Sequence, residues 1–209
     1  MVKPFILSLV FFFTLSVSLT SQSLYGSGIS ADDALVRIIF TDSVPDMNIE
    51  IGSINFSTAD RSLSSKYHAV SPGMYFFEIG SEWIEFIPRS GKYFTLVIEE
   101  SGCLIFEDKE HKSPAKTQLY FYNLLKTEKA TFHVTDAGEI LFRDISPETS
   151  EQIAINPLNI PFSITTLSGK SIDLGSIPMN RGGSVSVLLM ENKYKFRSII
   201  INAEIETGL

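Results

Sequence analysis

The feature that most constrains this chain is an apolar periodicity of two residues. From Ala34 onward, short runs rich in Val, Ile, Phe and Tyr alternate with polar positions or stand as brief apolar blocks, and segments with Pro or Gly separate them. A period of two is typical of β-strands, whereas a helix repeats about every 3.6 residues. Segments 71–73 and 88–91 combine the fixed φ of Pro with the positive φ that Gly tolerates, which suits tight turns. The sequence therefore predicts an all-β fold.

The expected strands form two series. The first series covers residues 35–41, 48–54, 67–70, 74–79, 82–87, 93–99 and 104–107. The second series covers residues 118–124, 130–134, 139–143, 152–155, 162–166, 171–174, 184–190 and 194–201. In each series the strongest apolar run comes next to last, at 93–98 and at 184–189, which indicates one plan used twice. About seven short strands in a half of roughly 80 to 90 residues fit a small β-sandwich.

A charged stretch separates the two series. Residues 108–114 read Asp-Lys-Glu-His-Lys-Ser-Pro and include no apolar residue, which is typical of an interdomain linker. We therefore predict two tandem small antiparallel β-sandwich domains after a cleaved signal peptide. The predicted boundaries are 1–23 for the signal peptide, 24–108 for the N-terminal β-sandwich, 109–115 for the linker and 116–209 for the C-terminal β-sandwich.

The first residues resemble a secretory signal peptide. Lys3 precedes the apolar segment 4–19, and Ser21 and Ser23 provide small residues at positions −3 and −1 of a cleavage site. An uncleaved membrane anchor is the alternative, but about 15 apolar residues fall short of the roughly 20 that a spanning helix needs. We therefore expect export to the periplasm and a protein that is soluble after cleavage.

The charge and the cysteine count exclude several classes of function. The chain has 17 Lys and Arg against 24 Asp and Glu, a formal charge of −7, which does not suit a nucleic-acid binder. One Cys and 3 His leave no material for a disulfide or a Cys-based zinc cluster, so neither a metal nor a cofactor is expected. Cys103 lies in an apolar run, where a small buried core residue is the expectation.

Three aromatic residues fall on the polar side of the alternation. Trp83 shares a strand face with Glu85, and Tyr120 and Tyr122 lie on the side opposite to Leu119. Exposed aromatic rings stack on sugars or anchor protein interfaces, so these three are the candidate binding residues. The alternative is that they pack against the other domain, a neighbouring loop or the flat side of the sheet.

Several short segments, in one order, are similar to a known family. They are Leu24-Tyr25-Gly26, Val36-Arg37-Ile38, Pro72-Gly73-Met74-Tyr75, Tyr93-Phe94-Thr95-Leu96-Val97, Asn123-Leu124, Ile155-Asn156-Pro157 and Arg181-Gly182-Gly183. The chain resembles the AlgF family, the periplasmic accessory proteins of alginate O-acetylation. The resemblance implies two β-sandwich modules that work with a membrane-bound O-acyltransferase and periplasmic SGNH-type acetyltransferases on an exported polysaccharide. It also implies an adaptor or polymer-binding component rather than the transferase.

Two departures from the family concern polymer binding. The linker is more acidic here, and Tyr120 and Tyr122 stand where the family tends to have Arg and a polar residue, which weakens the case for uronate binding. An anionic polymer would also gain nothing from long-range attraction to an acidic protein. Direct contact with polymer would then depend on stacking or on a local basic patch. The candidate residues for that patch are Arg89, Lys92, Lys193, Lys195 and Arg197.

The search for catalytic residues yields none. The nucleophile elbow G-x-S-x-G is absent from the sequence, and the three His are far apart. We therefore expect a non-enzymatic accessory or adaptor protein of polysaccharide O-acetylation. A stand-alone carbohydrate-binding protein that uses the exposed aromatics is the main alternative, and an esterase or transferase with a hidden triad is a third.

Overall fold

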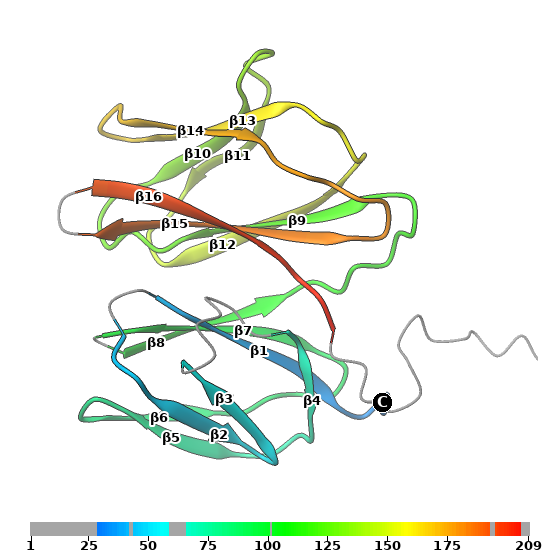
Figure 1. The fold of residues 1–209 in the computed structure, drawn as a ribbon, viewed down its shortest axis with the longest axis vertical. Coiled ribbons are helices and arrows are strands. Elements are labelled where there is room, and N and C mark those ends of the chain that lie inside the picture. Colours follow the sequence, from blue (N-terminus) through cyan, green and yellow to red (C-terminus); the bar gives the residue numbers. More distant parts are fainter. Residues whose placement is uncertain (1–28, 42–43, 59–65, 101, 193–194, 206–209) are drawn as a thin grey trace, which may run out of the picture.

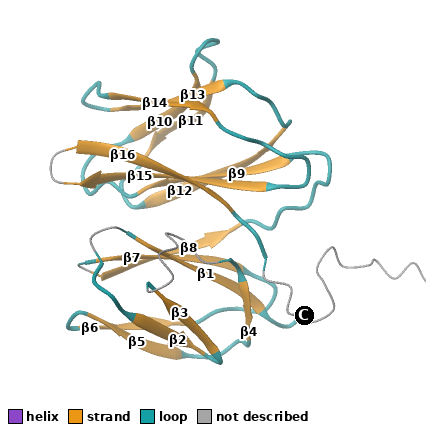
Figure 2. Cartoon of the chain, viewed as in Figure 1, coloured by secondary structure: helices purple, strands orange, loops and turns teal. Residues whose placement is uncertain are grey.

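The structure is a computed structural model. It describes residues 29–41, 44–58, 66–100, 102–192 and 195–205. The expected signal peptide, the segment Leu24-Tyr25-Gly26 and Lys193 lie outside these residues. The described part is all-β and has no helix, as predicted (Figure 2). Within it, accordingly, no helix is long and apolar enough to span a membrane.

Two layers of strands make up the N-terminal half. Its strands are β1 Ala34–Phe40, β2 Asn48–Ile51, β3 Ile54–Ser57, β4 His68–Val70, β5 Tyr75–Ile79, β6 Glu82–Phe86, β7 Tyr93–Glu99 and β8 Gly102–Asp108. One layer is a sheet of order β4-β1-β7-β8, and the other consists of the hairpins β2-β3 and β5-β6. Apolar side chains from both layers, among them Ile38, Leu96, Phe77 and Phe86, are buried between them.

The C-terminal half repeats this arrangement with two full sheets. Its strands are β9 Thr117–Asn123, β10 Ala130–Val134, β11 Ile140–Ile145, β12 Thr149–Ile155, β13 Pro161–Thr166, β14 Ser171–Ser176, β15 Ser184–Asn192 and β16 Lys195–Asn202. The sheet orders are β12-β9-β15-β16 and β11-β10-β13-β14. The order β12-β9-β15-β16 matches β4-β1-β7-β8 position by position, so the repeated plan expected from the sequence is present.

The expectation of purely antiparallel sheets is wrong for the central strand pair of each half. β1 pairs parallel with β7, and β9 pairs parallel with β15. A parallel pair needs a crossover connection, and the strands between β1 and β7 supply one by forming the opposite layer. Apolar alternation marks the faces of a strand but not its direction, so the sequence pattern did not reveal this pairing.

The two halves stack through their central sheets, as Figure 1 shows, with β1, β7 and β8 facing β9, β12 and β15. An apolar cluster formed by both halves fills this contact, and Ile39 and Val97 of the N-terminal half meet Leu188 and Met190 of the C-terminal half in it. Every residue of β1 and of β9 is buried, because each strand has its own core on one side and the other half on the other. Strand β1 is apolar except for Arg37, as is typical of a strand covered on both faces, whereas β9 also buries the polar residues Thr117, Gln118 and Asn123.

One expected strand is instead a hairpin. Residues 48–54 form the whole of β2, a turn and the start of β3, with Ile51 paired to Ile54. Gly52 has a φ of 64°, a left-handed conformation that reverses the chain at low steric cost. The prediction of one continuous strand was wrong because it passed over this glycine.

Candidate functional site

A fully buried arginine lies where the two halves meet. Arg37, in the middle of β1, has 0% exposure. Its Nε donates to Thr95 Oγ1 at 2.8 Å, on the neighbouring strand β7. Its Nη2 donates across the junction to Tyr122 Oη at 3.0 Å and to Ser186 Oγ at 2.6 Å. One side chain thus binds both halves together.

A buried carboxylate completes the cluster. Asp108, the last residue of β8, accepts hydrogen bonds from Tyr67 Oη at 2.6 Å and from Tyr122 Oη at 2.6 Å, and a further one from the Thr95 hydroxyl. The Arg37 guanidinium also lies over the Tyr67 ring, 4.7 Å from its centroid. The positive and negative charges are therefore connected through hydroxyl groups, which offsets part of the cost of burying them. Arg37 Nη1 is buried without a hydrogen-bond partner among the described residues.

The charge states of the residues in this cluster favour the hydrogen bonds that join the two halves. Burial by itself lowers the pKa of Arg37, but electrostatic interactions with Tyr67, Tyr122 and the Asp108 carboxylate, together with the hydrogen bond to Tyr122, hold that pKa above its ordinary value. Burial raises the pKa of Tyr67 and of Tyr122 well above that of a free phenol, so both are neutral at pH 7. The hydroxyls of Thr95 and Ser186 belong to residues with 0% exposure and do not face solvent.

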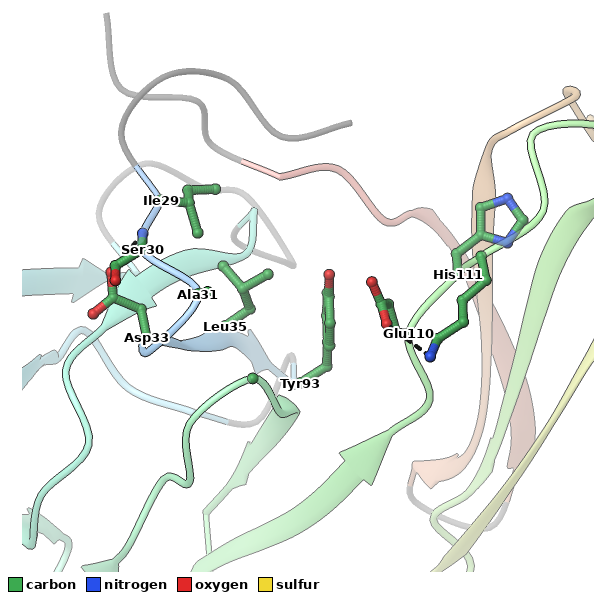
Figure 3. Close-up of a pocket in the computed structure, with 10 residues that line it drawn as sticks. Ile29, Ser30, Ala31, Asp33, Leu35, Tyr93, Glu110 and His111 are labelled. Carbon is green, nitrogen blue, oxygen red and sulfur yellow. Dashed lines mark hydrogen bonds and ion pairs between the residues drawn. The ribbon is translucent and has the colours of Figure 1, made fainter. Parts of the chain in front are cut away.

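A cleft borders the cluster. It has a volume of about 440 Å³ and is lined by Tyr67, Tyr120 and His111, together with the backbone around Gly182. A neighbouring hollow of about 550 Å³ shares His111 with it and continues past Tyr93 (Figure 3). Both ring nitrogens of His111 are buried and have no hydrogen-bond partner among the described residues. The cleft is therefore lined by aromatic residues and by an imidazole whose ring nitrogens are buried and unpaired among the described residues.

The structure buries two of the three candidate binding residues. Tyr120 and Tyr122 point away from the C-terminal core, as the alternation indicated, but their exposed fractions are only 3% and 0%. The expectation that they are exposed is wrong, because the N-terminal half covers that face of β9. Tyr120 Oη donates to the Lys109 carbonyl at 2.8 Å, and its ring stacks with that of Tyr122.

Trp83 is exposed, as the sequence predicted. Its side chain is 69% exposed on β6, the largest exposed fraction of any aromatic residue that the structure describes. The register places it opposite Glu78 of β5. It lies on the N-terminal half and remote from Tyr120 and Tyr122, so the three candidates do not form one surface.

The structure does not bring together the four candidate basic residues that it describes. Arg89 and Lys92 both pair with Glu107, which reduces their net positive field. Lys195 and Arg197 lie on β16, which begins at the opposite side of the molecule in Figure 1 from the start of β7, the strand that follows Lys92. These pairs therefore occupy separate surfaces.

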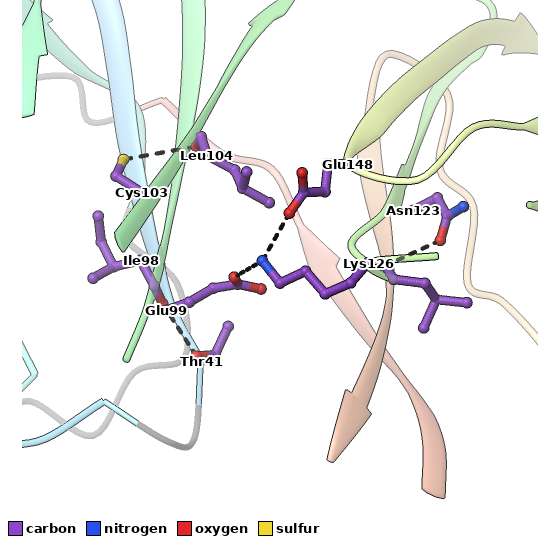
Figure 4. A network of polar contacts seen from close by, with 9 residues as sticks. Thr41, Ile98, Glu99, Cys103, Leu104, Asn123, Lys126 and Glu148 are labelled. Atoms are coloured by element: carbon purple, nitrogen blue, oxygen red, sulfur yellow. Dashed lines mark hydrogen bonds and ion pairs between the residues drawn. The ribbon is translucent and has the colours of Figure 1, made fainter. Parts of the chain in front are cut away.

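An exposed ion-pair network forms a second link between the halves. Lys126 Nζ lies 2.6 Å from Glu99 of β7 and 2.8 Å from Glu148, just before β12 (Figure 4). Neither this network nor the roles of Arg37 and Asp108 were expected from the sequence. A signal for Arg37 was present, because it is the one charged residue in the apolar strand β1.

The single cysteine, Cys103, lies against the N-terminal core. Burial, and after it the charge of Glu99, raises the pKa of the Cys103 thiol to about 12, and this side chain packs on the N-terminal core. In the ranges that the structure describes, no group of three or more His, Cys, Asp or Glu side chains is arranged to hold a metal ion.

Comparisons with known proteins agree on one family. The family described as "Alginate O-acetyl transferase AlgF" matches residues 7–186. The alginate biosynthesis protein AlgF of Pseudomonas aeruginosa is 23% identical over 77% of this chain and 74% of its own length. The protein of the same name from Azotobacter vinelandii is 24% identical over 77% of this chain and 73% of its own.

A solved structure gives a weaker likeness. The C-terminal domain of AlgF from P. aeruginosa is 22% identical, covers 42% of this chain and 98% of that domain, and superposes with a TM-score of 0.38. The identification therefore depends on the sequence comparisons. Because the family match extends over most of its length, the chain belongs to the AlgF family.

Proposed function

We propose that this protein is a periplasmic, non-catalytic adaptor in the O-acetylation of an exported polysaccharide, alginate or an alginate-like polymer. The observation that carries the proposal is membership of a family described as alginate O-acetyl transferase, with relatives named for alginate biosynthesis. Its partners in this proposal are a membrane-bound O-acyltransferase and periplasmic SGNH-type acetyltransferases. The apolar segment 4–19 supports export.

The structure supports an adaptor more than a transferase. An acyl-transfer nucleophile needs a base within hydrogen-bond reach and access to substrate. The hydroxyls beside the charged groups, those of Thr95 and Ser186, belong to residues with 0% exposure. They are committed to Arg37 and Asp108 instead. Two sandwiches stacked through a buried contact, by contrast, present two outer faces, which suits simultaneous contact with two partners.

Deletion of the gene tests the proposal. We expect the secreted polymer to lose its acetyl groups while its yield and chain length are retained, and we expect the plasmid-borne gene to restore acetylation. An unchanged acetyl content in the deletion strain would contradict the acetylation role. The purified protein should release acetate from p-nitrophenyl acetate no faster than buffer does. Turnover that a serine-directed inhibitor abolishes would instead identify an enzyme.

The exposure of Trp83 favours one second candidate, a stand-alone carbohydrate-binding protein. In that case Trp83→Ala should weaken binding of alginate oligosaccharides measured by calorimetry, and gene deletion should leave acetylation intact. Tyr120 and Tyr122 take no part in this candidate, since both are buried.

A further inference from the structure

Four large apolar side chains share the outer face of the hairpin β5-β6. Met74, Phe76, Trp83 and Ile87 have exposed fractions of 58%, 54%, 69% and 50%. They point outward because the alternate residues Phe77, Ile79 and Phe86 fill the N-terminal core. A cluster of this kind on a small protein marks an interaction surface, whereas single exposed apolar residues do not.

Register makes these side chains neighbours. In the antiparallel pair β5-β6, Phe76 lies opposite Glu85 and Glu78 lies opposite Trp83. Phe76 and Trp83 are therefore diagonal neighbours on one face, within reach of each other for rings of their size. We call the four apolar residues, together with Glu78 and Glu85, the distal face, because the hairpin lies in the layer farthest from the C-terminal half in Figure 1.

The surroundings of the distal face are acidic. Its four-strand layer, β2, β3, β5 and β6, includes Glu50, Glu78, Glu82 and Glu85 but no Lys or Arg. Glu50, Glu78 and Glu85 are exposed. Among the described residues no cation pairs with Glu78 or Glu85. The distal face therefore presents a partner with an apolar centre, bordered by glutamates whose charge no neighbouring cation neutralises.

We propose that the distal face docks a protein whose contact surface has an apolar centre bordered by Lys and Arg. The proposal rests on the proposed function for the identity of that partner, a protein component of the acetylation machinery. Aromatic anchors at the centre of an interface provide most of its binding energy, and complementary charge at the border selects the partner and speeds its association.

Charge decides against the other occupants. A polyuronate or an anionic lipid surface would meet Glu78 and Glu85 with like charge. A second copy of this chain would present the same face, and the isologous contact of a two-fold dimer would place one acidic border against another. A partner with basic border residues meets neither objection.

Photocrosslinking in the host cell tests the proposal. A benzoylphenylalanine is placed at Trp83 of the full chain and, as the control, at Leu167, which is 75% exposed on the C-terminal half. We expect a covalent adduct with a periplasmic protein from position 83 and none from 167, with Lys or Arg near the crosslinked peptide. An adduct with a second copy only, or no adduct, would overturn the proposal.

Charge reversal supplies the second arm. The variant Glu78→Lys/Glu85→Lys should lose the adduct, whereas Asp136→Lys/Glu139→Lys, on an exposed turn of the other half, should retain it. Once the crosslinked partner has been purified, Trp83→Ala should raise the dissociation constant of the complex between this chain and that partner at least about tenfold. Retention of the adduct by the Glu78/Glu85 variant, or Trp83-dependent binding of alginate oligosaccharides, would refute this docking mode. Unchanged melting temperatures verify that the variants fold.

Acetylation measurements separate this proposal from the proposed function. If the adduct and its charge dependence are found but gene deletion leaves acetylation unchanged, the docking face stands and the acetylation role fails. If deletion abolishes acetylation but Phe76→Ser/Trp83→Ser restores it as fully as wild type, the docking proposal fails and the acetylation role stands.

Discussion

Arg37 Nη2 donates to Ser186 Oγ over 2.6 Å, although 149 residues separate the two in the chain. Arg37 belongs to β1 and Ser186 to β15, so the bond crosses between the facing sheets of the two halves. A buried guanidinium adds little net stability by itself, but it makes any other stacking of the sheets costly. The contact between the halves therefore buries apolar surface and, through the Arg37 hydrogen bonds, also favours one stacking arrangement over others.

Loss of the buried guanidinium should destabilise the protein strongly. We expect Arg37→Met to lower the free energy of unfolding by about 3–5 kcal/mol, since it leaves Asp108 buried without its compensating charge. Urea unfolding followed by circular dichroism measures this change. The control Arg143→Met removes an exposed arginine of β11 and should change stability by less than about 0.5 kcal/mol. Equal effects of the two substitutions would contradict the role of Arg37 in joining the two halves.

Stability should fall in alkali because of the buried tyrosines. Their raised pKa means that Tyr67 and Tyr122 keep their protons in the native state, whereas the unfolded chain releases them above about pH 10. Their contribution is complete below that pH, and each lowers the unfolding free energy by up to about 1.4 kcal/mol per pH unit above it. Urea unfolding between pH 8.5 and 11 tests this dependence. If the unfolding free energy of Tyr67→Phe fell with pH as steeply as that of the wild type, the result would count against this explanation.

The exposed link at Lys126 should matter far less. Its side chain is 55% exposed, so solvent screens its pairs with Glu99 and Glu148. We expect Lys126→Ala to cost about 0.2–1 kcal/mol, and this difference should shrink as NaCl is raised to 1 M. Thermal melts at low and high salt measure it. A loss comparable with that of Arg37→Met would show that the interface is held by its border instead of its centre.

The β2-β3 turn should be sensitive to a single methyl group. Gly52 has a φ of 64°, and the atom nearest to an added Cβ lies at an ordinary contact distance of 3.5 Å. Gly52→Ala is therefore destabilised by the backbone conformation and not by a steric clash. The expected cost is about 1–2 kcal/mol. Gly73 is the matched control, because it lacks a positive φ and its added Cβ would lie 3.6 Å from the Tyr75 ring. Gly73→Ala should be neutral or slightly stabilising, and chemical denaturation distinguishes the two.

The thiol of Cys103 should be unreactive in the folded protein. Burial and the nearby Glu99 raise its pKa to about 12, so the thiolate is scarce at neutral pH. We expect slow modification by Ellman's reagent at pH 7.5 and rapid modification in 6 M guanidinium chloride. Fast labelling of the native protein would show that the thiol is more accessible than the structure indicates.

Alternation predicted the strands well and the surfaces less well. Trp83 and Tyr122 gave the same signal, an aromatic residue on the polar side of a strand, yet one is 69% exposed and the other 0%. The alternation of a strand shows only on which side of its own sheet a residue lies. Whether solvent or another sheet lies on that side depends on segments far away in the chain. Arg37 was overlooked for the same reason, since its partners Tyr122 and Ser186 belong to the other half.

The sequence by itself determined the all-β class, most strand positions and the AlgF resemblance, because a period of two and short ordered segments are local properties of the chain. Only the tertiary structure decided that β1 and β7 run parallel, that two sandwiches stack through their central sheets, and that Arg37 meets Asp108 through shared hydroxyls. Those relationships depend on contacts between residues distant in sequence, where burial of apolar faces and pairing of buried charge select one arrangement among many with the same local pattern.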